Sequence, residues 1–263
     1  MAATPSNAPT ALDQVDARAW ACVDFLSDVH LHSAEAATAA AWMNYLRHSP
    51  AQALFILGDL FEAWVGDDVL QHPLGAFEQS CAQALADCAR QRPVFFLCGN
   101  RDFLIGPAFL AQTGVQALSD PCRIDSRAGV LLLSHGDALC TEDHEYQAFR
   151  TQVRSSAWQS AFLAQSLPDR LEQARAMRAQ SQARQQHLAS LPDVNPQACD
   201  QALVAHQADT LIHGHTHRPG WHGLGPGRQR WVLSDWQADG PQARTEVLRL
   251  EGDQWQRVPL APL

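Results

Sequence analysis

The sequence contains no lysine, so its 19 basic side chains are all arginines. Acidic side chains number 28, and the formal net charge is −9. Nucleic-acid phosphates attract proteins whose basic residues form a patch or stripe. The charge balance therefore argues against a general nucleic-acid-binding protein, and against a DNA nuclease in particular.

Long hydrophobic runs are also missing. No window approaches the roughly 18 apolar residues that a membrane-spanning helix requires, so any membrane contact is expected to be peripheral. Residues 1–13 are rich in Ala, Pro, Ser and Asn and have neither a basic start nor an apolar run, unlike a secretory signal. We expect residues 1–19 to form a disordered leader.

The cysteines show no paired spacing. There are seven, scattered along the chain without a C-x-x-C pair, which argues against a disulfide framework or a structural zinc site. A reducing cytoplasm is the simplest environment for such a chain. No internal repeat is visible, and 263 residues are enough for one large domain or for a core with a smaller cap.

Five short apolar runs each end abruptly in polar residues. The runs are residues 21–26, 53–57, 94–98, 130–133 and 210–212. Runs of this length predict strands buried on both faces, and the segments 34–47 and 74–90 between the first three have helical character. Strands alternating with helices predict an α/β fold. In such sheets, functional side chains gather beyond the carboxyl ends of the strands.

Residues 141–208 have a different composition. They contain few β-branched residues and many Ala, Gln and Arg, and prolines interrupt them. We predict a helical insertion cap here, over a core formed by residues 20–140 and 209–263. From residue 230 onward the chain returns to strand character, at 231–233, 245–250 and 255–258.

Most of the polar clusters have an ordinary explanation when taken singly. Asp28 and His30 lie two apart, so on an extended chain both could bind one ion, but they also fit a polar loop. Asp59 and Asn100 occur in sequences common in turns. His135 alone would be taken for a structural histidine.

The alternating histidines His213, His215 and His217 are harder to explain by packing, because burying imidazoles without partners costs free energy. With five clusters after five apolar runs, metal binding is the favoured interpretation. The predicted ligands are Asp28, His30, Asp59, Asn100, His135, His215 and His217.

Seven side chains are too many for one ion. Oxygen and nitrogen donors without thiolates suit Mn²⁺, Fe²⁺ or Zn²⁺, and two ions about 3.5–4 Å apart form the usual clamp for phosphoryl transfer. Such a pair activates water, while Arg101 could add positive charge beside the phosphoryl oxygens. The residues thus predict a metal-dependent phosphoesterase.

The order of these motifs resembles a known superfamily. Asp-x-His, Gly-Asp, Gly-Asn-Arg-Asp, His-Gly-Asp and Gly-His-x-His look like the calcineurin-like metallophosphoesterases, whose fold is a two-sheet β-sandwich flanked by helices. Longer strings at 56–64, 99–104, 140–143, 146–150, 193–195 and 212–219 resemble the UDP-2,3-diacylglucosamine pyrophosphohydrolases of lipid A biosynthesis. The resemblance extends from about residue 21 to the C-terminus.

The resemblance implies a reaction and a distribution of roles. Two Mn²⁺ ions are expected, one held by Asp28, His30 and His217 and the other by Asn100, His135 and His215, with Asp59 bridging. Water attacks the α-phosphorus of UDP-2,3-diacylglucosamine, which gives UMP and 2,3-diacylglucosamine 1-phosphate. The implied catalytic residues are Asp59, Asn100, Arg101 and His135, and the implied substrate contacts are Asn100, Arg101, Asp143, Ser181, Gln185 and His215.

The same resemblance makes the helical insertion a cap that shelters acyl chains. Trp158, Phe162 and Leu163 could face those chains or the membrane, or could form only the core of the cap. A lipid substrate implies a cytoplasmic protein, peripheral on the cytoplasmic face of the inner membrane, and no required protein partner is evident.

One part of the cap departs from the family pattern. The family has a lysine about three residues after the position of Gln185, where this chain has Gln186, His187 and Leu188. The chain is also about one residue short before Asp193. His187 or Arg184 is the candidate to replace the missing head-group contact.

Two alternatives remain open. A nucleotide or cyclic-nucleotide phosphodiesterase on the same core would lack a helical cap with apolar faces. A metal-stabilised interaction scaffold would be expected to have lost metal ligands, whereas all seven are present in this chain.

Overall fold

The computed structural model describes residues 11–187, 193–241 and 243–260, which contain two β-sheets joined through one long strand, β5. The strands follow the order β11-β10-β2-β3-β4-β5-β6-β7-β9-β8, and β1 also pairs with β5. Their bounds are β1 Leu12–Asp16, β2 Cys22–Leu26, β3 Ala53–Leu57, β4 Val94–Leu97, β5 Gln116–Ser126, β6 Gly129–Leu133, β7 Thr210–His213, β8 Gly220–Gly225, β9 Arg228–Val232, β10 Glu246–Glu251 and β11 Gln254–Pro259.

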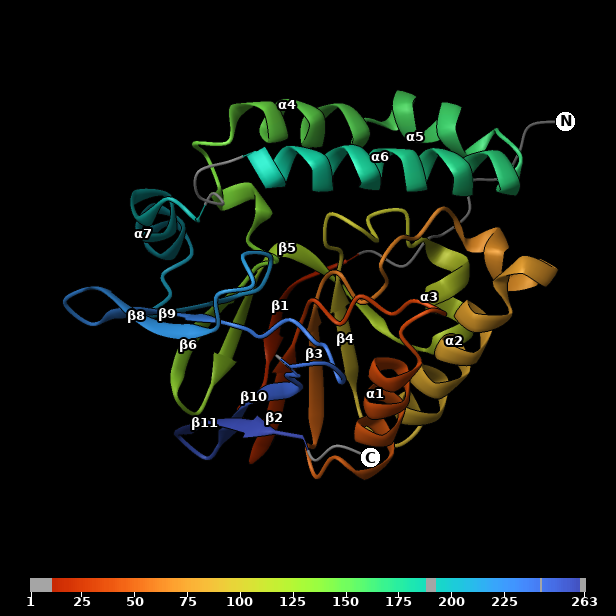
Figure 1. Cartoon of the computed structure of the whole chain (residues 1–263). Coiled ribbons are helices and arrows are strands. Elements are labelled where there is room, and N and C mark those ends of the chain that lie inside the picture. The colour runs from red at the N-terminus through yellow and green to blue at the C-terminus, as the bar shows by residue number, and fades with distance from the viewer. Residues whose placement is uncertain (1–10, 188–192, 242, 261–263) are drawn as a thin grey trace, which may run out of the picture.

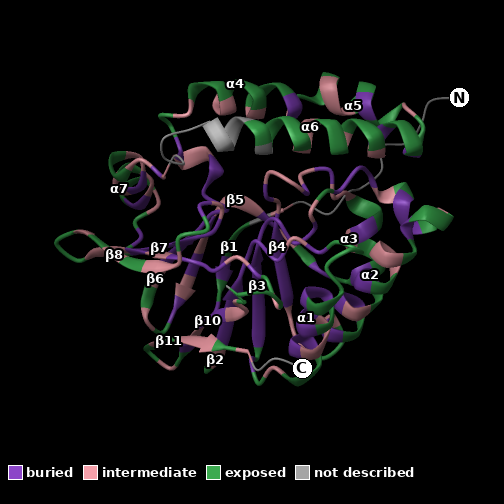
Figure 2. Ribbon diagram, in the orientation of Figure 1, coloured by how far each residue is buried: buried purple, intermediate pink, exposed green. Residues whose placement is uncertain are grey.

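The central strands are buried on both faces, as their sequences predict (Figure 2). In β3, Phe55 and Leu57 lie in the core between the two sheets, whereas Leu54 and Ile56 face the neighbouring helices. Adjacent strand residues point to opposite faces, so a continuous apolar run fills two cores at once. The rings of Phe25, Phe55 and Phe95 stack on one another between the sheets.

Helices cover the two outer faces (Figure 1). Helices α1 (Ala36–His48), α2 (Ala76–Ala89) and α3 (Pro107–Thr113) pack on the sheet that contains β2, β3 and β4. On the other sheet, Cys199 and Leu203 of α7 (Pro196–Ala205) pack on Leu132 and Leu211. The order helix, sheet, sheet, helix confirms the predicted α/β sandwich.

Three further helices lie above the sandwich in Figure 1: α4 (His144–Val153), α5 (Ser156–Leu163) and α6 (Leu167–His187). The side chains of Asp143 and Ser155 cap the first two by accepting hydrogen bonds from the N–H groups of Tyr146 and Trp158. The predicted insertion, residues 141–208, thus has two parts. Helices α4–α6 lie across the carboxyl ends of the strands, and α7 packs on the outer face of a sheet. Three short 3₁₀ helices cover Asp67–Gln71, Pro73–Gly75 and Asp137–Leu139.

The expectation of a disordered leader through residue 19 is wrong for residues 12–16, which form β1. This strand runs parallel to β5, pairing Val15 with Ile124. Strand β4 pairs only with residues 116 and 117 of β5, so β1 hydrogen-bonds to the remainder of that edge. Residues 1–10 lie outside the described part of the chain. Of the helices within the described ranges, none has the length and apolar character to cross a bilayer.

Candidate metal centre

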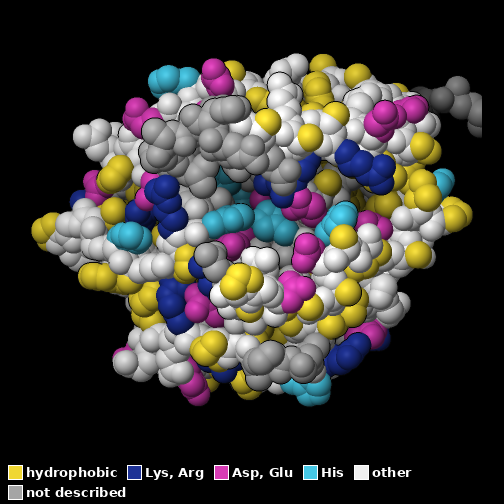
Figure 3. All heavy atoms as spheres, in the orientation of Figure 1, with side chains coloured by type: hydrophobic (Ala, Val, Ile, Leu, Met, Phe, Trp, Pro, Cys, Tyr) yellow, Lys and Arg dark blue, Asp and Glu magenta, His cyan; other side chains and the backbone are white. Residues whose placement is uncertain are grey.

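The loops after five strands converge beneath α4–α6. Asp28 follows β2, Asp59 follows β3, Asn100 follows β4, His135 follows β6, and His215 and His217 follow β7. Parallel strands end at the same edge of their sheet, which brings these distant segments together. In Figure 3, histidine and acidic side chains gather in a hollow in the middle of the visible face.

The backbone at these positions is unusual. Asp28, His30, Asp59, His215 and His217 have φ angles between 52° and 68°, the left-handed region that side chains other than glycine rarely adopt. Each such residue costs on the order of 1–2 kcal/mol, and strained backbone of this kind is concentrated at functional sites. The conformation thus marks five of the seven predicted ligands without reference to their chemistry.

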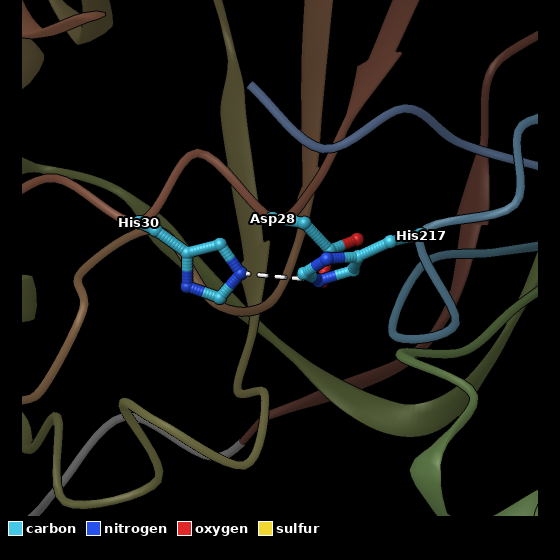
Figure 4. Close-up of side chains that lie close together, drawn as sticks. All are labelled: Asp28, His30 and His217. Atoms are coloured by element: carbon cyan, nitrogen blue, oxygen red, sulfur yellow. Dashed lines mark hydrogen bonds and ion pairs between the residues drawn. The ribbon is translucent and has the colours of Figure 1, made fainter. Parts of the chain in front are cut away.

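Asp28, His30 and His217 form the first group (Figure 4). The Nε2 atoms of the two histidines lie 3.2 Å apart. The Oδ1 atom of Asp28 lies 3.5 Å from the Nε2 atom of His217 and 4.0 Å from that of His30. Three donor atoms are therefore directed at one small volume.

The second group centres on His135, Asn100 and His215. Asn100 Oδ1 lies 2.8 Å from His135 Nε2 and 2.9 Å from His215 Nδ1. The Oδ1 atom of Asp59 lies 3.6 Å from His135 Nε2, and Asp28 is close enough to join Asp59 and His135 in a potential cation site. All seven predicted ligands thus lie in one cluster.

The charges in this cluster favour a cation. Burial acts to lower the pKa of His135, but the carboxylates of Asp59 and Asp28 outweigh burial and raise it to about 9. Burial and the neighbouring His135 together lower the pKa of His215 to about 4. Burial acts to raise the pKa of Asp28, but His217 holds it below its usual range. Carboxylate, amide and imidazole donors without thiolates suit Mn²⁺, Fe²⁺ or Zn²⁺, so the residues present fit a metal centre.

Arg101 lies directly beside the cluster. Its backbone N–H donates to Asp59 Oδ1 at 2.8 Å, and its Nε atom lies 3.7 Å from Asp59 Oδ2. Its side chain also lines a cavity of about 340 Å³ under the α4–α6 helices. The cavity is bordered largely by apolar side chains, namely Ala63, Trp64, Val65, Phe103, Leu104, Phe149, Val153, Trp158, Phe162, Ala174 and Met177.

Of the three apolar cap side chains predicted to face acyl chains, membrane or the core of the cap, two line the cavity and one does not. Trp158 and Phe162 stack with ring centroids 4.8 Å apart and both line the cavity. Leu163 is not part of the lining and is 43% exposed.

The predicted substrate contacts in the cap have different positions. Ser181 lines the cavity, whereas Asp143 does not and instead caps α4. The side chains of Gln185, Arg184, Gln186 and His187, and the whole of Leu188, lie outside the described part of the chain.

His213 is not directed into the cluster of ligands. Its Nδ1 atom lies 2.9 Å from the carbonyl oxygen of Gly214, and its Nε2 atom lies 3.4 Å from Arg230. Burial lowers the pKa of His213 to about 4. Arg230 in turn binds Asp193 through two hydrogen bonds of 3.3 Å. A neutral His213 therefore joins the ligand loop to a structural ion pair.

Sequence reasoning assigned no role to Asp137, a buried carboxylate. It accepts hydrogen bonds from Tyr146 Oη at 2.7 Å and Arg150 Nε at 2.8 Å, and Arg154 lies 3.5 Å away. Burial opposes ionisation of Asp137, but His135 and the two arginines keep its pKa below the usual range. Asp137 thus ties α4 to the His135 loop. Two features of the sequence could have indicated this role. Asp137 lies two residues after the predicted ligand His135, and arginines that could pair with it are concentrated in residues 141–208.

Glu62 was also missed, although it lies three residues after Asp59. Its carboxylate contacts His30, Arg101 and Arg178. No spacing rule connects residues 62 and 178, so the sequence alone offered no signal for that contact.

This chain is similar to several known proteins. A family model described as calcineurin-like phosphoesterase matches residues 23–219. A UDP-2,3-diacylglucosamine hydrolase of Stenotrophomonas maltophilia is 40% identical over 250 residues, covering 90% of this chain and 98% of that protein. One of Chromobacterium violaceum is 44% identical over 227 residues, covering 81% and 90%. A solved dimetal phosphatase from Danio rerio is 15% identical, with a TM-score of 0.47, covering 91% of this chain and 99% of that one.

The family match covers most of the chain and includes all seven predicted ligands, and the similarity to the relatives extends over the cap as well. The chain is therefore a metal-dependent hydrolase that belongs to the calcineurin-like phosphoesterases and, within them, to the UDP-2,3-diacylglucosamine hydrolase family.

Proposed function

We propose that this protein hydrolyses the pyrophosphate of UDP-2,3-diacylglucosamine to UMP and 2,3-diacylglucosamine 1-phosphate. The observation that carries the proposal is the position of the clustered metal donors beside a largely apolar cavity, because Asn100 and Arg101 line the cavity and also contact His135 and Asp59 of the cluster. A diphosphate that carries acyl chains needs both environments next to each other. The relatives described above are named for hydrolysis of this substrate.

Two Mn²⁺ ions are the proposed cofactors. Asp28, His30 and His217 would hold one ion, Asn100, His135 and His215 would hold the other, and Asp59 would bridge them. The distances within the two groups support this division. Bound there, the ions would lower the pKa of a water molecule toward neutrality and balance the charge of the phosphoryl oxygens.

The remaining proposed roles belong to side chains at the edge of the centre. Arg101 is positioned to donate hydrogen bonds to the diphosphate, because its guanidinium lies beside Asp59 and borders the cavity. Asn100 and His215 would contact the same group. Water attacks the α-phosphorus, and the bond to the bridging oxygen breaks, so that this oxygen leaves with the sugar phosphate.

The cavity is the proposed site for acyl chains. Its volume of about 340 Å³ falls at the small end of the range for ligand pockets. Trp158 and Phe162 supply apolar surface to it, and Ser181 at its border is the proposed contact to the head group. Gln185 is proposed for the same contact, and Asp143 is proposed to act at the substrate through the start of α4, which it caps.

Product analysis in ¹⁸O-labelled water tests the reaction. We expect purified protein with Mn²⁺ to convert UDP-2,3-diacylglucosamine to labelled UMP and unlabelled acylated sugar phosphate, as measured by mass spectrometry. Label in the lipid product would contradict attack on the α-phosphorus.

Two controls accompany this measurement. Protein stripped of metal by a chelator should give no product until Mn²⁺ is restored. Unacylated UDP-glucosamine should be a much poorer substrate, because it leaves the apolar cavity unfilled. Cleavage of simple phosphodiesters without cleavage of the acylated substrate would indicate a general phosphodiesterase instead.

We also propose peripheral attachment to the cytoplasmic face of the inner membrane. Phe149 of α4 and Leu163 of α5 are 42% and 43% exposed on the cap. Apolar side chains at such positions could enter a lipid surface from which the substrate is taken. In flotation with vesicles that contain anionic lipid, we expect wild-type protein to rise with the vesicles and the double variant Phe149→Ser/Leu163→Ser to rise less. Wild-type protein that stays wholly in the soluble fraction would contradict attachment.

A further inference from the structure

Glu62 stands beside the metal centre because its backbone is fixed there. Residues 31 and 61 form an isolated parallel β-bridge, and the N–H of Glu62 donates to the carbonyl oxygen of Leu31 at 3.1 Å. This pairing aligns the segment after β3 with the segment after β2. The side chain of Glu62 is consequently held next to His30 and is 21% exposed.

The two oxygens of Glu62 have different partners. Oε2 lies 3.3 Å from His30 Nδ1. Oε1 forms an ion pair with Arg178 of α6 and lies 3.8 Å from Arg101. One carboxylate therefore contacts a predicted metal ligand, the arginine beside the diphosphate site and a helix of the cap.

The contact to His30 has a chemical consequence. The Nε2 atom of His30 faces Asp28 and His217, so this nitrogen must keep its lone pair free to bind a cation. Within the described residues, the buried Nδ1 atom has no hydrogen-bond partner of good geometry, and the Glu62 oxygen at 3.3 Å is an acceptor within reach of it. A carboxylate at that distance favours the tautomer with the proton on Nδ1, which leaves the lone pair on Nε2.

We propose that Glu62 is a positioning residue of the metal centre. Through Oε2 it selects the His30 tautomer that can bind a cation, and through Oε1 it ties α6 to the same centre. This inference rests on the metal centre proposed above. In this role Glu62 contacts neither metal nor substrate, whereas each of the seven predicted ligands would contact a metal ion.

Titration of metal-free protein with Mn²⁺ tests the inference, with free Mn²⁺ followed by its electron paramagnetic resonance signal. Wild-type protein should bind two ions. Glu62→Ala should weaken one of the two sites by about 10–100-fold, the usual effect of removing an acceptor behind a histidine ligand. Glu62→Gln retains an oxygen that can accept from Nδ1–H and should recover part of this loss.

Asp68→Ala is the matched control. Asp68 pairs with Arg170, which also belongs to α6, and within the described residues its ion pair is with this arginine and not with His30. This variant should lose a link to the cap and keep wild-type Mn²⁺ affinity. Circular dichroism and thermal melting would verify that each variant is folded.

The possible outcomes distinguish failure of the role of Glu62 from failure of the metal centre. Wild-type affinity at both sites in Glu62→Ala would overturn the role of Glu62. Equal losses in Glu62→Ala and Asp68→Ala would also overturn it, because the effect would then come from the cap. A wild-type protein that binds no Mn²⁺ would instead overturn the metal centre itself.

Discussion

Asp59→Ala and His135→Ala are expected to fold and yet to lose turnover by more than about 10³-fold. Metal-assisted stabilisation of a phosphoryl group contributes several kcal/mol, and each 1.36 kcal/mol changes the rate tenfold. Both residues belong to the cluster of buried donors, where the Oδ1 atom of Asp59 lies 3.6 Å from His135 Nε2. Removing either donor should leave at least one ion without its full set of ligands.

Steady-state kinetics at saturating substrate with excess Mn²⁺ would measure this effect. His48→Ala is a suitable control, since His48 is an exposed histidine at the end of α1 that contacts the carbonyl oxygen of Asn44. It should retain wild-type activity. Asp59→Asn preserves the size of the side chain and should also be nearly inactive, because a neutral amide cannot bridge two cations as a carboxylate does. Unchanged turnover in Asp59→Ala or His135→Ala would contradict the proposed two-metal site.

The clustering of the predicted ligands could be foreseen from the sequence because strand geometry is local. A strand buried on both faces is a continuous apolar run, and its end is marked by the first polar residues. The apolar runs that end at residues 57 and 98 therefore predicted polar side chains at Asp59 and Asn100. Parallel pairing of β3 with β4 brings both residues to one edge of the sheet. Convergence of the clusters follows from this topology, which is why the fold and the clustered positions were predictable together.

Contacts between distant segments could not be read in the same way. Strand β1 buries Val15 against the inter-sheet core, but its two apolar residues, Leu12 and Val15, lie three positions apart and do not show the alternation that predicts a strand. Its position depends on the edge of β5 that β4 leaves unpaired. The separation of α7 from α4–α6 has a similar cause, because prolines mark helix ends without stating which surface each helix covers.

Gly58→Ala is expected to give the largest loss of stability among the substitutions considered. Gly58 has a φ angle of +83°, and a Cβ atom there would lie 2.5 Å from the backbone N of Gly99 and 2.6 Å from its Cα. Both atoms are backbone, two residues beyond the end of β4, so they cannot move aside as a flexible side chain would. Overpacking costs about 1–3 kcal/mol and left-handed backbone about 1–2 kcal/mol more.

Together these costs predict a destabilisation of roughly 2–5 kcal/mol, or a fall in melting temperature of about 5–15 °C for a chain of this length. Gly252→Ala separates the two causes, because Gly252 has a φ angle of +64° but no atom within 4 Å of the added Cβ. It should show only the cost of the left-handed backbone. The added methyl at Gly58 would also lie 2.8 Å from His135 Nδ1, so Mn²⁺ affinity should fall in Gly58→Ala and stay unchanged in Gly252→Ala. Equal losses of melting temperature in the two variants would show that the close approach of Gly58 to Gly99 does not limit stability, and wild-type Mn²⁺ affinity in Gly58→Ala would show that the metal centre does not depend on it.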